Sequence, residues 1–151
     1  MSKPSFVYVT YIRSTPEKVW QALTAPEFTR KVWFGATHQT DWKPGAPWTL
    51  LLEDGRVADA GTIVECDPPR RLVIGDWQNQ FMPEAKAAGP SRCTIDIEAV
   101  GASVKLTITH VSETENRALI DGVSGGWPKI ISNIKSLLET GELALVAKPA
   151  A

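Results

Sequence analysis

Two stretches of strict alternation, residues 92–100 and 103–111, constrain the fold of this chain more than any other feature. In both, apolar residues occupy every second position, and polar or charged residues lie between them. Side chains of a strand point alternately to opposite faces, so the pattern predicts two strands with one buried and one solvent-facing side. Gly101-Ala102 separates them and predicts the turn of an antiparallel hairpin. His110 falls on the inward side, near the end of the second strand.

The residues before this hairpin predict one strand, two short helices and several further strands. Residues 6–13 are β-branched and aromatic without a helical period, which predicts a strand. Pro16 and Pro26 each open an amphipathic stretch, and proline suits the first turn of a helix, so two short helices are expected. Turn signals at Pro44-Gly45 and Asp54-Gly55 then divide the chain into more strands.

A long apolar stripe at helical spacing runs through the last third of the chain. Its members are Ile120, Val123, Trp127, Ile130, Ile131, Ile134, Leu137 and Leu138. Gly125, Gly126 and Pro128 interrupt it, yet the stripe keeps its phase across them, which favours one kinked helix over two helices. The two glycines are expected to let the backbone approach neighbouring strands. The segment from Ser112 to Glu115 predicts a capping box at the helix start, and Gly141 predicts its end.

This order of elements predicts an α+β fold. A curved antiparallel sheet of about six to seven strands would carry two short helices and one long C-terminal helix across its concave face. One helix cannot fill such a face, so we expect a cavity lined by the inward side chains of the strands. The length of 151 residues predicts a single domain over residues 1–151, with a loose tail beyond about residue 143.

Composition excludes several classes of function. The net charge is −1, with 43% hydrophobic and 22% charged residues, so the chain has no basic surface for nucleic acid. No signal peptide is evident, and no apolar run is long enough to span a membrane. Cys66 and Cys93 form neither a metal motif nor a disulfide framework, which favours a reducing, cytoplasmic setting. We expect no cofactor and no metal.

Six tryptophans are the most informative feature of the composition, because large aromatic walls suit a flat or apolar ligand. Chain order and alternation place several of them around the expected cavity. The predicted ligand-binding residues are Trp33, Phe34, Trp48, Trp77, Ile108, His110, Trp127 and Ile131. Residues 78–91 lack periodicity and predict a mobile loop, which could control access to the cavity together with residues 29–35.

The sequence offers little for catalysis. His110 could form an acid/base pair with Asp76, although alternation puts Asp76 on the face opposite to Trp77. No known nucleophile, phosphate-loop or metalloprotease motif occurs. The sequence therefore favours a non-catalytic protein and names no catalytic residue.

Four segments resemble one known family. They are YIRSTPEKVWQALTAPEFTRKVWFG, TDWKPGAPWTL, DPPRRLVIGDW and VSGGWPKIISNIKSLLETGE. Together the chain from Phe6 to about Leu143 resembles bacterial proteins related to the C-terminal domain of the activator of Hsp90 ATPase, in the START-like superfamily. The resemblance implies a helix-grip fold. It does not fix an activity, because relatives in this superfamily bind hydrophobic molecules or catalyse cyclisations.

Three functions are compatible with these observations. The favoured one is non-catalytic binding of a small hydrophobic or aromatic molecule between sheet and C-terminal helix, in a role that could be related to stress. The resemblance also admits a co-chaperone that acts on an Hsp90-type ATPase, although 151 residues leave no room for the separate N-terminal Hsp90-binding domain of the eukaryotic activator. The third is a START-like cyclase or hydrolase that uses His110. A homodimer is compatible with each.

Overall fold

The structure, a computed structural model, describes residues 3–145. Its elements are β1 (Ser5–Ile12), α1 (Pro16–Thr24), α2 (Pro26–Val32), β2 (Thr37–Gln39), β3 (Pro47–Leu51), β4 (Val57–Asp67), β5 (Arg71–Asn79), α3 (Pro83–Ala87), β6 (Ser91–Val100), β7 (Ser103–Ser112) and α4 (Ala118–Thr140). The predicted order of elements is confirmed, with α3 as an addition. The residues 78–91 are therefore not one irregular loop: they include the end of β5, the short helix α3 and the first residue of β6.

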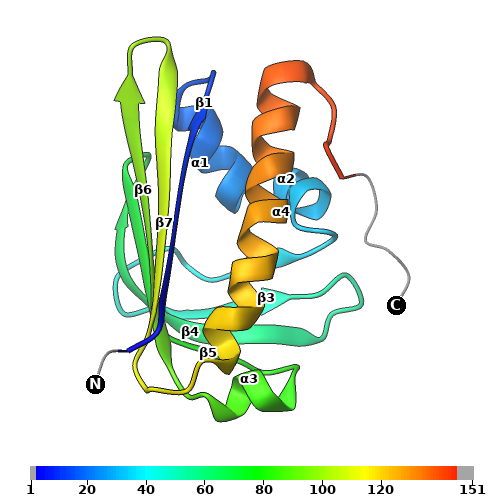
Figure 1. Cartoon of the computed structure of the whole chain (residues 1–151). Helices are drawn as coiled ribbons and strands as arrows, with labels where there is room; N and C mark the ends of the chain where they lie inside the picture. The colour runs from blue at the N-terminus through cyan, green and yellow to red at the C-terminus, as the bar shows by residue number, and fades with distance from the viewer. Residues whose placement is uncertain (1–2, 146–151) are drawn as a thin grey trace.

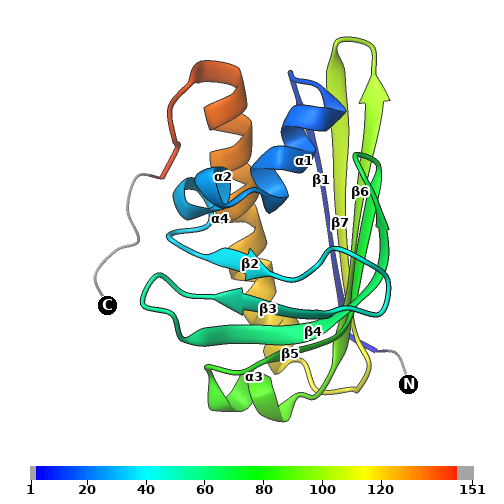
Figure 2. The ribbon, with the colours of Figure 1, turned by 180° about the vertical axis from the view of Figure 1, so that it is seen from behind.

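All seven strands pair antiparallel in one sheet, in the order β1-β7-β6-β5-β4-β3-β2. The sheet curves around α4, which lies along its concave side (Figure 1). In the opposite view α1 and α2 lie at the C-terminal half of α4, and α3 lies near its N-terminal end (Figure 2). The α+β fold with a long C-terminal helix over a curved sheet is thus confirmed.

The neighbouring strands β4 and β5 pair with irregularities that bend the sheet. The β4–β5 pairing shifts register between Ala60 and Thr62 and again between Ile63 and Glu65. Gly61 lies in the first bulge, where an added Cβ would come within 2.6 Å of the Gly75 carbonyl oxygen. Such a contact is shorter than any real Cβ contact, so only glycine lets the two strands approach here. Bulges of this kind bend a sheet and increase its twist.

The helix α4 is continuous from Ala118 to Thr140 and includes Pro128 in its interior. This confirms that one helix carries the whole apolar stripe. Proline removes one backbone hydrogen bond inside a helix, and the carbonyl of the residue four positions earlier loses its donor. Gly141, with φ of 85°, ends the helix in the left-handed conformation, as predicted.

Two predictions about this helix are wrong. Ser112 is the last residue of β7 and not an N-cap, because its hydroxyl accepts the Thr114 amide in a local turn at 3.1 Å and the helix begins six residues later. The Asn116 side chain instead accepts the Ala118 amide at 2.9 Å. Added Cβ atoms at Gly125 or Gly126 would meet nothing within 4 Å, so these glycines do not serve a close approach to the strands.

Asn133, fully buried on α4, holds the chain that follows the helix. Its amide nitrogen donates to the carbonyls of Val32 and Leu145, and its oxygen accepts the Leu145 amide at 2.6 Å. The segment up to Leu145 is thereby attached to α2 and α4. The rest of the predicted loose tail lies outside the described residues.

Candidate functional site

A cavity opens between α4 and the strands β3, β4 and β5. It consists of two adjoining hollows of about 190 Å³ and 430 Å³. Both are lined by Trp33, Leu50, Asp59, Asn79, Gly126 and Ile130. We refer to this pair of hollows as the α4 cavity. The α3 segment contributes Met82 and Ala85 to the smaller hollow, and the end of α2 contributes Phe34 to the larger one.

Glycines of α4 form part of the cavity wall. Gly122 and Gly126 are one helical turn apart and both line the smaller hollow. An added Cβ at either position would meet nothing within 4 Å, so the missing side chains leave the space open. Alanine at these positions would favour the helix, whereas glycine disfavours it by about 1 kcal/mol each. The interruption of the apolar stripe therefore coincides with the opening of a cavity.

Behind the cavity lies a cluster of aromatic rings, the aromatic cluster, made of Trp33, His38, Trp42, Trp48, Trp77, His110 and Trp127. Five of these rings contact one another in a closed circuit, with centroid distances from 4.5 to 6.1 Å. Most pairs meet edge to face or tilted, as the charge distribution of aromatic rings favours. Three of its members, Trp33, Trp77 and Trp127, also line the smaller hollow of the α4 cavity.

Both histidines of the chain are neutral members of this cluster. His38 Nε2 donates to the Leu23 carbonyl at 2.8 Å, so its Nδ1 is free to accept the Trp48 indole N–H at 3.0 Å. His110 Nδ1 accepts the Trp127 indole N–H at 3.2 Å, so its Nε2 donates to Ser91 Oγ at 2.8 Å. Burial lowers the pKa of each imidazole to about 4, which keeps both rings uncharged at neutral pH.

These hydrogen bonds are incompatible with the acid/base pair between His110 and Asp76. Both of its ring nitrogens are engaged, and the side chain is fully buried. Asp76 is exposed on the outer face of β5, opposite to the buried Trp77, as the alternation predicted. His110 and Asp76 therefore do not form a pair. Within the described lining of the α4 cavity there is no serine, threonine, cysteine or histidine that could act as a nucleophile beside a base.

The polar end of the cavity was not anticipated from the sequence. Asp59 and Asn79 are cross-strand partners in β4 and β5, and Asn79 Nδ2 donates to Asp59 Oδ1 at 3.0 Å. Burial raises the pKa of Asp59 to about 6, against the opposing effect of the N–H groups of Trp77 and Asn79. Asp59 is only 8% exposed although it is a charged residue type. The one signal in the sequence is the run of small residues around it, Ala58 to Gly61, which leaves room beside its carboxyl group.

The structure divides the eight predicted ligand-binding residues into two groups. Four line the α4 cavity: Trp33, Phe34, Trp77 and Trp127. The other four are packed behind it and are at most 1% exposed: Trp48, Ile108, His110 and Ile131. That any of them binds a ligand stays a prediction.

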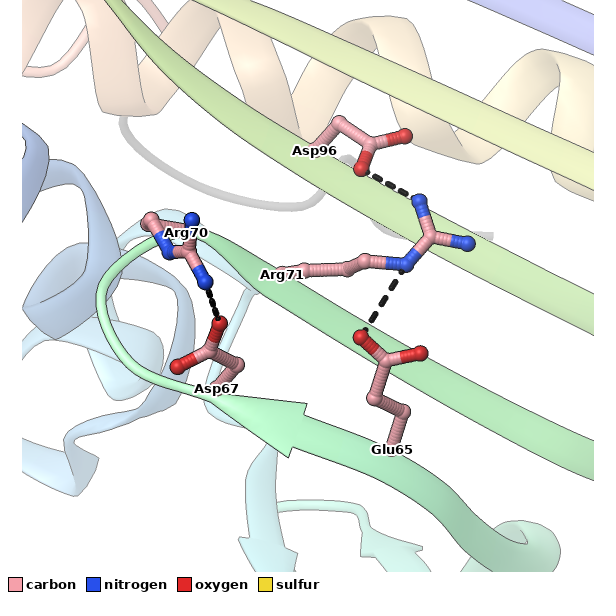
Figure 3. A network of polar contacts seen from close by, with 5 residues as sticks. All are labelled: Glu65, Asp67, Arg70, Arg71 and Asp96. Atoms are coloured by element: carbon pink, nitrogen blue, oxygen red, sulfur yellow. Dashed lines mark hydrogen bonds and ion pairs between the residues drawn. The ribbon is translucent and has the colours of Figure 1, made fainter.

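The outer face of the sheet carries a second polar network (Figure 3). Arg71 lies between Asp96, at 2.6 Å, and Glu65, at 3.3 Å, and Arg70 pairs with Asp67 beside it. These side chains are 42% to 74% exposed, and exposed ion pairs contribute little to stability. The hollow of about 820 Å³ at this network is open to solvent and lined by charges of both signs. It has the character of an ordinary protein surface.

Neither a metal-binding cluster nor a disulfide occurs among residues 3–145. Among residues 3–145, no three side chains of His, Cys, Asp or Glu converge in a way that could hold a metal ion. Cys66 and Cys93 are both free thiols, and burial raises the pKa of Cys93 far above its usual value. No helix in the described part of the chain is long and apolar enough to cross a membrane.

The sequence of this chain matches the model of one protein family. The family model for "Activator of Hsp90 ATPase homolog 1-like protein" matches residues 13–139. A sequence search finds no significant match among curated proteins.

Similar solved structures share the fold at low sequence identity. CalU16 from Micromonospora echinospora is 19% identical, with a TM-score of 0.71 over 92% of this chain and 78% of that one. An HSP90 activator from Plasmodium falciparum is 22% identical, with a TM-score of 0.71 over 89% and 95% of the two chains. The Aha1 dimer from Colwellia psychrerythraea is 18% identical, with a TM-score of 0.67 over 91% and 98%.

Proposed function

This chain belongs to the family of Activator of Hsp90 ATPase homolog 1-like proteins, and on that premise we propose that it binds a small hydrophobic or aromatic molecule in the α4 cavity without catalysing its conversion. The observation that carries the proposal is the composition of the cavity wall. Trp33, Trp77 and Trp127 supply aromatic faces, and Gly122 and Gly126 add two positions without a side chain to the part of the wall that α4 forms. Ligand pockets of this kind are mostly apolar, with a few polar groups that orient the ligand.

A neutral fluorescent probe, N-phenyl-1-naphthylamine, tests the proposal, because its emission rises when it enters an apolar cavity. We expect saturable binding to the wild-type protein. Gly126→Leu fills the cavity and should weaken binding at least about tenfold, which corresponds to about 1.4 kcal/mol. Gly125→Leu is the matched control, since Gly125 is exposed and lies outside the cavity lining. Absence of saturable binding, or equal binding by the two leucine variants, would refute the proposal.

A second candidate function, a co-chaperone or other protein-interaction module, is favoured by the outer face of β1. Val7, Val9 and Tyr11 alternate along this strand and are 59%, 46% and 52% exposed. Exposed apolar rows of this kind mark interaction surfaces. The similar proteins named above include an HSP90 activator and a dimer, so both a chaperone and a second copy of this chain are candidate partners.

The variant Val9→Lys tests this alternative, because a lysine in the centre of the row disrupts an apolar contact. If the row is an interface, the variant should lose stimulation of a bacterial Hsp90 ATPase, or dissociate a dimer in size-exclusion chromatography, while probe binding in the α4 cavity is kept. A monomeric wild-type protein with no effect on such an ATPase would eliminate this candidate.

A further inference from the structure

The polar end of the α4 cavity contains a carboxylate whose hydrogen-bonding capacity is largely unused. An ionised carboxylate can accept about four hydrogen bonds. Asp59 accepts one of normal geometry, from Asn79 Nδ2 at 3.0 Å. Asn79 is fixed from its other side, because its oxygen accepts the backbone amides of Phe81 and Met82. The Asn79 amide therefore holds the Asp59 carboxyl group in place at the cavity wall.

A second buried polar group at this end is the indole N–H of Trp77. Trp77 is 3% exposed and lines the smaller hollow together with Asp59. Its indole N–H lies close enough to the Asp59 carboxyl group to lower the pKa of that group, yet no acceptor among residues 3–145 meets it with normal hydrogen-bond geometry. Buried polar groups without partners are rare in folded proteins and mark unmet interactions.

Within the part of the chain that the structure describes, no cationic side chain pairs with this carboxylate. The ion pairs among residues 3–145 do not involve Asp59. Lys129 is the one cationic side chain in the described lining, and it is exposed on the rim of the larger hollow. Trp33 and Trp127 line the same hollow as Asp59, and the electron-rich faces of their rings attract cations.

We propose that Asp59 anchors the ligand of the α4 cavity, and that this ligand is a small ring-bearing molecule with a protonated amine. The ammonium group donates to the Asp59 carboxylate, and the ring packs against Trp33 and Trp127. The inference rests on the proposed function, because it names the class of ligand that the same cavity takes.

The state of Asp59 fits this role. Burial raises its pKa to about 6, so the carboxyl group is mainly ionised at neutral pH in spite of its environment. A buried carboxylate without a cationic partner destabilises the folded protein. An ammonium group of the ligand would neutralise the buried negative charge of Asp59, whereas a carboxylate group of the ligand would add a second negative charge beside it.

Three probes with the same ring separate these possibilities: 2-phenylethylamine as the cation, 2-phenylethanol as the neutral analogue and phenylacetate as the anion. Binding to the full chain is measured by the quenching of tryptophan fluorescence and by the shifts of indole N–H signals in NMR spectra. We expect the amine to bind about tenfold more tightly than the alcohol, a difference of about 1.4 kcal/mol, and phenylacetate to bind most weakly.

Asp59→Asn keeps the shape of the side chain and its acceptor for Asn79 while it removes the charge. We expect this variant to bind the amine and the alcohol equally well. Asp76→Asn is the matched control, because Asp76 is exposed outside the cavity and has a φ of 49°, which asparagine tolerates. It should keep the wild-type preference for the amine.

The outcomes distinguish this inference from the function on which it rests. If all three probes bind alike and Asp59→Asn changes nothing, Asp59 is not the anchor, while apolar binding in the cavity still stands. Tighter binding of phenylacetate would also overturn the inference and would assign the polar contact to Lys129. Absence of binding by every probe would refute both proposals.

Discussion

Replacing Gly125 by alanine should stabilise the protein, although the added methyl group would contact no other side chain or strand. Gly125 lies inside α4, is exposed, and has no Cβ neighbour within 4 Å. Alanine is favoured over glycine in a helix interior by about 0.8–1.0 kcal/mol, because it loses less backbone freedom on folding. For a protein of this size, about 1 kcal/mol raises the melting temperature by about 2–4 °C. Urea and thermal unfolding, followed by far-ultraviolet circular dichroism, measure both quantities.

Gly141→Ala is the matched control for this experiment. Gly141 directly follows α4 and an added Cβ there would also meet open space, but its φ is 85°. A left-handed conformation disfavours residues with a Cβ by about 1–2 kcal/mol, so the same substitution should destabilise the protein here. If Gly125→Ala also destabilised the protein, the helix could not be continuous at this point, and the reasoning would be refuted.

Three further predictions concern stability. In the folded protein His38 and His110 each have a pKa of about 4, below the usual 6.5, so the unfolded chain binds more protons between these two pH values. The stabilising effect of the two neutral imidazoles should therefore be complete above pH 6.5 and should be lost as the pH falls toward 4, by up to about 2.7 kcal/mol per pH unit for both together. Urea unfolding at several pH values measures this loss. For Asp59 the sign is opposite, because folding raises its pKa from 3.8 to about 6. The free energy of unfolding of Asp59→Asn should therefore exceed that of the wild type by at most about 3 kcal/mol at pH 7, and the difference should vanish below pH 4. A variant as stable as the wild type at pH 7 would contradict the burial of the carboxylate. Gly61→Ala should lower the free energy of unfolding by at least about 2 kcal/mol in the same assay, because its Cβ would clash with the Gly75 carbonyl oxygen. An unchanged free energy of unfolding would contradict the close approach of β4 and β5 at this bulge.

The fold could be predicted from the sequence because its signals are local. Alternation in residues 92–100 and 103–111 recurs as the buried and exposed sides of β6 and β7. The Asp54-Gly55 turn lies between β3 and β4 as expected. The start of α4 was misplaced because Ser112 satisfies the capping pattern equally well from the end of a strand. A local hydroxyl–amide bond there does not require a helix.

The candidate site was harder to predict, since it depends on contacts between distant residues. The tryptophans were a correct guide to an aromatic cluster, but not to which rings face open space: Trp48 is enclosed while Trp33 lines the cavity. The bulges in β4 place Asp59 at the wall, and a bulge changes which residues of a strand face inward. Simple alternation therefore could not assign Asp59 to the interior.

The placement of unfavourable features argues that the α4 cavity is more than a packing defect. Glycine at positions 122 and 126 destabilises α4, and no close contact requires it, because an added Cβ at either position would meet nothing within 4 Å. Asp59, which lines the same hollow as these glycines, is buried, and neither a cation for it nor an acceptor for the Trp77 N–H is found among residues 3–145. Each feature destabilises the folded state, and alanine or asparagine would relieve most of them. Features that oppose stability and converge on one cavity are typical of a binding site, because a bound ligand supplies the contacts that the protein alone leaves unmade.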